Sequence, residues 1–350
     1  MDSLKLIEDL AQAFGAPGFE DDVIKVAKKY VPKGYTASHD SLLNFYMQKE
    51  RDPSKPTVLL DAHSDEVGCI VQAIKDNGSI VFAPLGEWVA ATIYAQRIDI
   101  LNLNNEVITG VIASKMTHFG ADEGVAPKIH EMVIDVGASS KQEVIEKFNI
   151  APGCPIVPKS SFEQFGDVLI SKAFDCRLGC AAVIEVLERA NGLNLGVNLE
   201  GVLSSQEEIG HRGATVAGRV TKPDVVICFE GSPADDTLVE PHMVQTRMGQ
   251  GPMLRHMDGS MITNPRFLRF ALDIAKRCQI PCQESVRTRS YTNGAAFHLR
   301  NNGIPTIVIS CPVRYVHSHN SMAKFSDYLE TVRLTLEVVK GLDREVVKGF

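Results

Sequence analysis

The spacing of hydrophobic residues predicts two helices and a strand at the start of the chain and, after about residue 165, helices that alternate with strands. Two helices open it, because apolar residues recur at helical spacing within 3–31 and a Gly-Ala-Pro-Gly turn at 15–18 interrupts them. Further helices are predicted over 178–190, 264–278 and 323–342, and apolar runs predict strands over 57–60, 199–204, 224–229 and 306–310. This alternation is typical of an α/β fold built on one sheet.

Between about residues 69 and 165 the pattern changes to short segments in which apolar and polar residues alternate. These segments cover 79–82, 97–103, 107–112 and 132–136, and turn pairs such as Asn77-Gly78 separate them. The change predicts a small barrel-like all-β domain, residues 69–165, inserted into an α/β domain formed by 1–68 and 166–350.

Composition and charge narrow the kinds of ligand. The 350 residues include 36 basic and 43 acidic side chains, so the net charge of -7 does not favour nucleic acid or an anionic membrane as a partner. No apolar run approaches the roughly 20 residues of a membrane-spanning helix, and the first residues lack the features of a signal peptide. We therefore expect a cytoplasmic protein that binds a small molecule or a peptide.

The eight cysteines do not form a recognisable metal or disulfide framework. Cys176 and Cys180 are four residues apart, as are Cys278 and Cys282, and neither pair has the spacing of a zinc site. Without an export signal, reduced and mostly buried thiols are the better interpretation.

Polar side chains follow the predicted strands of the α/β part, where open sheets of this class bind ligands. His63 comes just after the first buried strand, and Asp65 lies on the same side of an extended chain, where its carboxylate can orient the imidazole. Glu207 and Glu208 follow a later strand. Taken singly, a lone histidine or a surface Glu-Glu pair has an ordinary structural explanation. Together they predict a site for zinc, cobalt or manganese.

Four motifs strongly resemble the dinuclear metallo-aminopeptidases that include glutamyl aminopeptidase and the tetrahedral TET peptidases. They read Asp-Ala-His-Ser-Asp-Glu at 61–66, Asp-Cys-Arg-Leu-Gly at 175–179, Gln-Glu-Glu-Ile-Gly-His-Arg-Gly at 206–213 and Arg-Tyr-Val-His-Ser at 314–318. They occur in the family's order over essentially the whole chain. The resemblance implies a mixed-sheet metallopeptidase domain with the β insertion.

The resemblance also implies the chemistry. Two divalent metal ions, zinc or cobalt with manganese as a further option, would act on the N-terminal bond of short peptides. Asp175 would bridge the ions, and Glu207 would be the general base, with Asp65 beside the site. The ligand set implied is His63, Asp175, Glu208, Glu230 and His317. The β insertion of such proteins mediates association, so a homo-oligomer from a dimer to a dodecamer is expected.

Several positions depart from the family pattern. Glu230 stands where Asp is common, Asn293 stands where a carboxylate is expected, and Cys176 follows the bridging residue where Asp or Asn is usual. We interpret Cys176 as space-filling and Asn293 as a change in substrate handling. Arg255 lies in a segment that resembles the glutamyl-preferring members, which predicts a preference for acidic N-terminal residues; a structural arginine paired elsewhere is the alternative.

Other functions stay open at this level. A deacylase or a carboxypeptidase can use the same metal scaffold, and a non-catalytic oligomeric scaffold could keep the fold alone. Against the scaffold, all five ligand positions and Glu207 have competent side chains.

Overall fold

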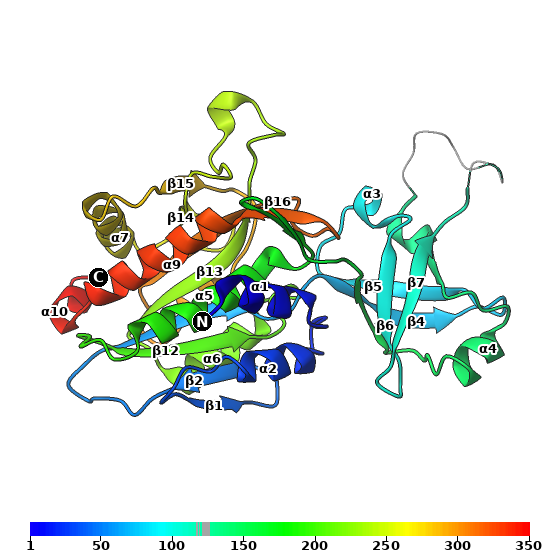
Figure 1. The fold of residues 1–350 in the computed structure, drawn as a ribbon, viewed down its shortest axis with the longest axis horizontal. Coiled ribbons are helices and arrows are strands. Elements are labelled where there is room, and N and C mark those ends of the chain that lie inside the picture. The colour runs from blue at the N-terminus through cyan, green and yellow to red at the C-terminus, as the bar shows by residue number, and fades with distance from the viewer. Residues whose placement is uncertain (117, 119, 121–126) are drawn as a thin grey trace.

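The computed structural model describes residues 1–116, 118, 120 and 127–350. A large mixed sheet with helices on its faces forms one part of the molecule, and a closed six-stranded barrel projects from it (Figure 1). The predicted fold class, an α/β mixed-sheet domain with a small barrel-like β insertion, is therefore confirmed.

The large sheet has the strand order β1-β2-β12-β3-β13-β16-β17-β11-β10, with β14 pairing to β16 and β15 to β14. Its central strands β12, β3, β13 and β16 are parallel. Their register pairs Ser204 with His63 and Glu230 with Ser310, so their carboxyl ends meet at one edge. The bounds are β1 Thr36–His39, β2 Phe45–Gln48, β3 Thr57–His63, β10 Glu163–Phe165, β11 Val168–Ser171, β12 Asn198–Ser204, β13 Val225–Pro233, β14 Met253–Met257, β15 Gln283–Val286, β16 Thr306–Arg314 and β17 Ser321–Lys324.

Helices cover both faces of this sheet. Val58 and Leu60 of β3 belong to the core cluster that packs against α1, α5 and α9, whereas Leu59 points to a second cluster under α6 and α8. Burial on both faces explains the continuous apolar runs at 58–60 in β3, 225–229 in β13 and 307–309 in β16. The bounds are α1 Ser3–Gln12, α2 Asp21–Lys28, α3 Ala90–Ile93, α4 Lys141–Glu146, α5 Phe174–Ala190, α6 Arg212–Thr221, α7 Pro265–Arg277, α8 Gly294–Phe297, α9 Phe325–Lys340 and α10 Arg344–Lys348.

None of the helices in the described ranges is long and apolar enough to cross a membrane.

The barrel closes in the order β4-β5-β8-β7-β6-β9. Alternate residues of its strands point inward, and Ile80, Ile98, Ile100, Ile112 and Ile134 are buried in its core. The strands are β4 Gly68–Ile74, β5 Ile80–Leu85, β6 Arg97–Leu101, β7 Val107–Ala113, β8 Val133–Asp135 and β9 Pro155–Pro158. Strand β10 lies within the predicted insertion but pairs with β11 in the large sheet. The domain limits 69–165 stay a prediction.

Several elements differ from their predicted bounds. The last long helix begins at Phe325 instead of 323, because residues 321–324 form β17 and pair with β11 and β16. Strand β3 continues past its apolar run to His63, since its pairing with β12 extends to that residue. Tertiary pairing, which local sequence does not show, decides both ends.

Candidate metal centre

The five predicted ligands lie together at the carboxyl edge of the large sheet. His63 ends β3, Glu230 lies in β13, and Asp175 is the second residue of α5. Glu208 and His317 lie in the segments that follow β12 and β16. Their donor atoms form two groups that both contain Asp175: one with His63 and Glu230, the other with Glu208 and His317.

The spacing of these atoms fits a cation in each group. Nε2 of His63 lies 3.2 Å from Oδ1 of Asp175 and 3.4 Å from Oε1 of Glu230. Nε2 of His317 lies 3.5 Å from Oδ2 of Asp175 and 3.4 Å from Oε2 of Glu208. Two ligand atoms bound tetrahedrally to one zinc at its usual bond lengths are about 3.3 Å apart. Asp175 therefore presents one oxygen to each group, the arrangement a bridging carboxylate needs.

The electrostatics of the two groups point to a cation as well. Burial opposes a charge on His317, but the charge of Glu208 and a hydrogen bond with Asp175 raise its pKa to about 10. Burial raises the pKa of Glu208 to about 8. It also raises the pKa of Glu230 well above its ordinary value, helped by the charge of Asp175. Protonated imidazoles thus offset the buried carboxylates, and bound cations would replace those protons.

One ligand oxygen is left without a partner. Oε1 of Glu208 is buried and accepts no hydrogen bond from the described residues. A buried carboxylate oxygen is costly unless it is paired or binds a metal. With imidazole and carboxylate donors and no thiolate required, the residues present fit two zinc-like cations.

The segment that carries Glu207 and Glu208 is held by two buried carboxylates. Asp65 accepts the backbone N–H groups of Glu207 and Glu208, at 2.9 and 3.1 Å. Glu20, at the start of α2, accepts the N–H of Gln206 at 3.1 Å. The backbone N–H groups of three consecutive residues therefore donate to two buried carboxyl groups. These hydrogen bonds fix the directions in which the side chains of Glu207 and Glu208 point.

This finding changes the expected role of Asp65. The nearest oxygen to Nδ1 of His63 is the backbone carbonyl of Asp65, at 3.1 Å, whereas the carboxylate lies 3.5 Å away. The predicted pairing of the Asp65 carboxylate with the ring thus stays a prediction, and the two backbone amides and the carbonyl contact are additional roles of this residue. Asp65 still supports both the histidine and the glutamates.

Glu20 gives the fold a measurable pH dependence. Burial, followed by the charge of Asp65, raises its pKa from 4.5 to about 8. Between these values the folded chain keeps a proton that the unfolded chain loses, so the free energy of unfolding falls as pH rises, by up to about 1.4 kcal/mol per pH unit. Glu20→Gln keeps the acceptor oxygen but cannot ionise. Relative to wild type, we expect it to gain stability between about pH 5 and pH 8.

Urea unfolding of the metal-free proteins at both pH values measures this gain. The matched control is Glu8→Gln, on the exposed side of α1. A difference between Glu20→Gln and wild type that stays constant with pH would contradict the account.

A cavity of about 700 Å³ opens in front of the two groups. Asp175, Glu207, Glu208, Glu230 and His317 line it, and the barrel contributes Glu87 to its wall. The neighbouring Gly86 has a φ of +86°, and a Cβ there would lie 3.2 Å from Oε2 of Glu208. Only glycine lets the barrel approach the site this closely.

Two of the departures from the family pattern, Asn293 and Cys176, lie behind the cavity, whereas Glu230 lines it. Asn293 is buried and donates to Asp61 at 3.0 Å and to Ser204 at 2.8 Å, so it contacts the sheet beneath the site. Cys176 is fully buried, and its Sγ lies 3.4 Å from the carbonyl of Phe229. Its sulfur also belongs to the group of His63, Asp175 and Glu230. The interpretation of Asn293 as a change in substrate handling therefore has no contact with the cavity to support it.

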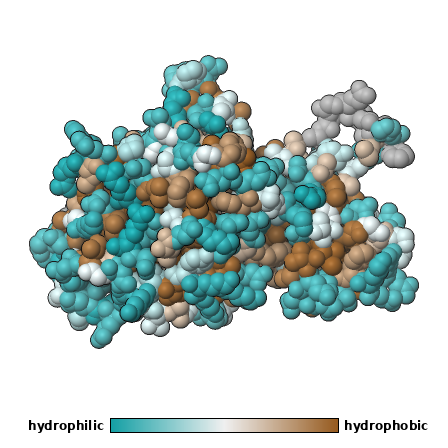
Figure 2. All heavy atoms as spheres, in the orientation of Figure 1, coloured by the Kyte–Doolittle hydropathy of each residue, from teal (hydrophilic) through white to brown (hydrophobic). Residues whose placement is uncertain are grey.

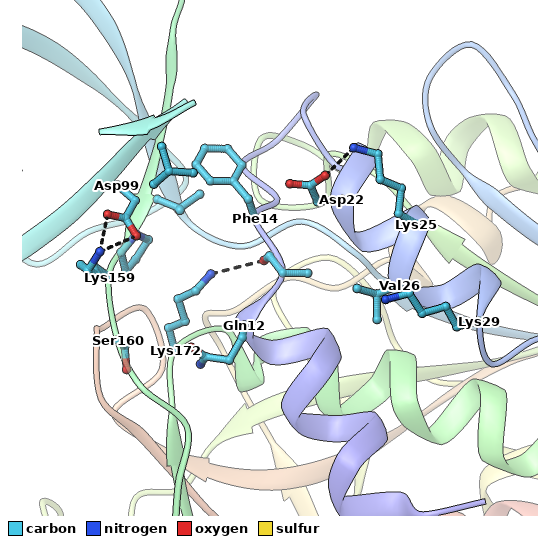
Figure 3. A pocket seen from close by; sticks show the side chains of 14 residues that line it. Gln12, Phe14, Asp22, Lys25, Val26, Lys29, Asp99, Lys159, Ser160 and Lys172 are labelled. Atoms are coloured by element: carbon cyan, nitrogen blue, oxygen red, sulfur yellow. Dashed lines mark hydrogen bonds and ion pairs between the residues drawn. The ribbon is translucent and has the colours of Figure 1, made fainter. Parts of the chain in front are cut away.

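A second cavity, of about 450 Å³, lies between the N-terminal helices and the barrel (Figure 3). Lysines dominate its wall, but Lys25 pairs with Asp22 at 2.7 Å and Lys159 with Asp99 at 3.0 Å. None of the predicted ligands lines it. The paired charges make it a polar junction between barrel and sheet, separate from the metal centre.

Two residues near the site were missed from the sequence. Glu20 is 186 positions from its partner Gln206, and no local pattern connects them. His211 lines the large cavity with Nε2 3.1 Å from Oε1 of Glu207. It lies inside the Gln206–Gly213 motif, four residues after Glu207. That position in the motif is the feature of the sequence that could have identified it.

Comparisons with known proteins show which family the chain belongs to. The model of the M42 glutamyl aminopeptidase family matches residues 44–334. The chain is 30% identical to the glutamyl aminopeptidase of Lactococcus lactis, over 99% of this chain and 97% of that protein. It is also 30% identical to the lysyl aminopeptidase of Pyrococcus furiosus, over 83% of this chain and 84% of that protein.

A solved structure extends the agreement to the fold. The TET aminopeptidase of the marine sediment archaeon Thaumarchaeota archaeon SCGC AB-539-E09 superposes with a TM-score of 0.94 at 33% identity, covering 99% of this chain and 98% of the other. The resemblance seen in the motifs is thus confirmed along the whole length, and the chain belongs to the peptidase M42 family of aminopeptidases.

Proposed function

We propose that this chain is an aminopeptidase that holds two divalent cations and hydrolyses the N-terminal bond of short peptides. The observation that carries the proposal is the pair of ligand groups that share Asp175 through different oxygens. His63 and Glu230 would complete one cation site, and Glu208 and His317 the other. Bound there, the cations would lower the pKa of a water and polarise the scissile carbonyl. Zinc or cobalt suits these donors best.

Glu207 is the proposed general base. Its side chain is about one-tenth exposed and lines the cavity beside the ligand Glu208. A carboxylate there takes a proton from the attacking water and passes it to the leaving amine. The backbone N–H groups of Glu207 and Glu208 stay on Asp65, so the carboxylates keep their directions while the proton moves.

A substrate panel tests the reaction class. Aminoacyl p-nitroanilides, N-acetylated amino acids and peptides with a blocked N-terminus are offered to the metal-loaded protein. We expect release of p-nitroaniline and no action on the blocked compounds. Preferential hydrolysis of N-acetylated amino acids would identify a deacylase, release of C-terminal residues a carboxypeptidase, and no turnover at all would favour a scaffold.

We further propose a preference for acidic N-terminal residues. Arg255 is buried in the cavity wall, but its guanidinium already contacts Asp258 at 3.2 Å and Ser232 at 2.6 Å. Arg287 is likewise paired, with Asp235 at 2.7 Å. Arg289 lines the same cavity, and its guanidinium forms no ion pair within the described residues.

A guanidinium without a carboxylate partner supports binding of a substrate carboxylate. The glutamyl and the lysyl relative are each 30% identical to this chain over the residues matched, so the percentage of identity does not decide the specificity and the proposal rests on the cavity.

Arg289→Ala is expected to lower kcat/KM for the Glu substrate by about 1.5 to 3 kcal/mol relative to the Leu substrate. Arg255→Ala is expected to act in the same direction but less, because its guanidinium is already paired with Asp258. The ratio of the two substrates in one preparation is the measurement, because it cancels any loss of folded protein caused by leaving Asp258 buried and unpaired. A wild-type enzyme that prefers Leu or Lys p-nitroanilide to the Glu analogue would contradict the preference.

We also propose that the barrel joins copies of the chain. Leu103 is 67% exposed, Val107 52% and Val111 42%, and the last two lie on the outward face of β7. Figure 2 shows hydrophobic atoms gathered on the barrel surface seen in that view. Apolar residues exposed along strands are commonly covered by association.

Light scattering at micromolar concentration should therefore give a mass well above that of one 38.3 kDa chain. Val111→Lys is expected to shift the mass toward the monomer, whereas Leu299→Lys, at a leucine outside the barrel that is 76% exposed, should not. A monomeric wild type would refute association.

A further inference from the structure

We propose that His211 is a positioning residue that orients the carboxylate of Glu207 for proton transfer; this inference rests on Glu207 being the general base. Nε2 of His211 lies 3.1 Å from Oε1 of Glu207, and both residues line the 700 Å³ cavity. The torsion about the Cβ–Cγ bond of histidine is broad, so rotation of the ring can direct its N–H toward that oxygen.

The backbone between the two residues brings their side chains together. The N–H groups of Gly210 and His211 both donate to the carbonyl of Glu207, at 2.9 and 3.0 Å. Gln206 and His211 have φ angles of +54°, which turn the chain sharply before and after this segment. The turn places residue 211 over residue 207, as one turn of helix would.

A purely structural role does not explain the position of the His211 imidazole. His211 occupies the N-cap position of α6, yet its side chain makes no capping hydrogen bond. Within the described residues, Glu207 is the ion-pair partner that the structure gives for its imidazole. The side chain is 19% exposed, so it is a wall of the cavity and not part of the core.

The contact assigns different tasks to the two oxygens of Glu207. With Oε1 held by the Nε2–H tautomer of His211, Oε2 takes the proton of the attacking water while the water oxygen bonds to the carbonyl carbon. When the C–N bond breaks, its electron pair goes to the leaving nitrogen, which takes the proton from Oε2. His211 keeps its own proton throughout, so it orients the base without being consumed.

A double-mutant cycle with Glu207→Gln tests the inference. His211→Ala is expected to lower kcat by about 10- to 100-fold, the scale of a misdirected catalytic group, with KM nearly unchanged. His211→Gln, which keeps an N–H donor of similar reach, should recover most of the loss. Because both residues act in one step, His211→Ala added to Glu207→Gln should cost nothing further. Metal content and the urea midpoint, measured on every variant, should stay at wild-type values.

A control variant shows whether loss of any histidine–glutamate pair affects turnover, and the remaining outcomes separate the inference from the proposed function. The control is His256→Ala, which breaks an exposed His–Glu pair, 2.7 Å from Glu284, and should leave kcat unchanged. If Glu207→Gln is inactive but His211→Ala is not impaired, or if the two losses multiply, the inference is overturned while the proposed function stands. If Glu207→Gln itself keeps near-normal turnover, the proposed base is wrong and the inference falls with it.

Discussion

Glu207→Gln is expected to keep both metal sites and the fold but to lower kcat by about 10² to 10⁴, the usual contribution of a general base. The amide has the size of the carboxylate but cannot accept the water's proton at neutral pH. The backbone N–H of residue 207 still donates to Asp65, so the neighbouring ligand Glu208 keeps its position.

The measurement is kcat on an aminoacyl p-nitroanilide for protein with its metal content determined. Glu87→Gln makes the matched control, because it removes a carboxylate from the wall of the same cavity on the barrel side. A metal-loaded Glu207→Gln sample that turns over at nearly the wild-type rate would remove Glu207 from the mechanism.

Removing the shared carboxylate should have the second large effect. Asp175→Ala takes one ligand from each group, because Oδ1 faces His63 and Oδ2 faces His317. We expect both cations to be lost, together with activity. His63→Ala removes a ligand from one group only, so it should chiefly weaken that site and leave about one cation per chain.

Elemental analysis after gel filtration gives the metal-to-protein ratio of each variant. Asp258→Asn serves as a control for loss of a buried carboxylate, since this residue pairs with Arg255 and is not a ligand. Two tightly held cations in Asp175→Ala would show that this carboxylate does not bridge them.

The part of the site that could be predicted is the part that local sequence describes. His63 ends a buried strand, and Glu208 and Glu230 each follow a predicted strand. The carboxyl ends of these parallel strands meet at one edge of the sheet, so the place of the three residues follows from the predicted fold. The resemblance of the four motifs, in their order along the chain, to the metallo-aminopeptidases then implied which residues are the metal ligands. The barrel was predictable for the same reason, because its alternation has the period of a half-buried strand.

What the sequence did not show depends on contacts between distant segments. Glu20 reaches Gln206 across 186 positions, and the left-handed φ of Gln206 that directs the glutamates is not a feature of its residue type. Arg255 was predicted to face a substrate carboxylate, but the turn after β14 returns Asp258 to it at 3.2 Å. Such pairings depend on how the chain folds back on itself, which periodicity does not encode.

Metal titration of the stripped protein tests the central claim most directly. The protein is freed of metal with a chelator, zinc or cobalt is added in steps, and release of p-nitroaniline is followed against the number of cations bound per chain. We predict no activity without metal and a rise that reaches its plateau at two cations per chain. Activity that survives the chelator, or a plateau at one cation with a second never bound, would contradict the dinuclear centre.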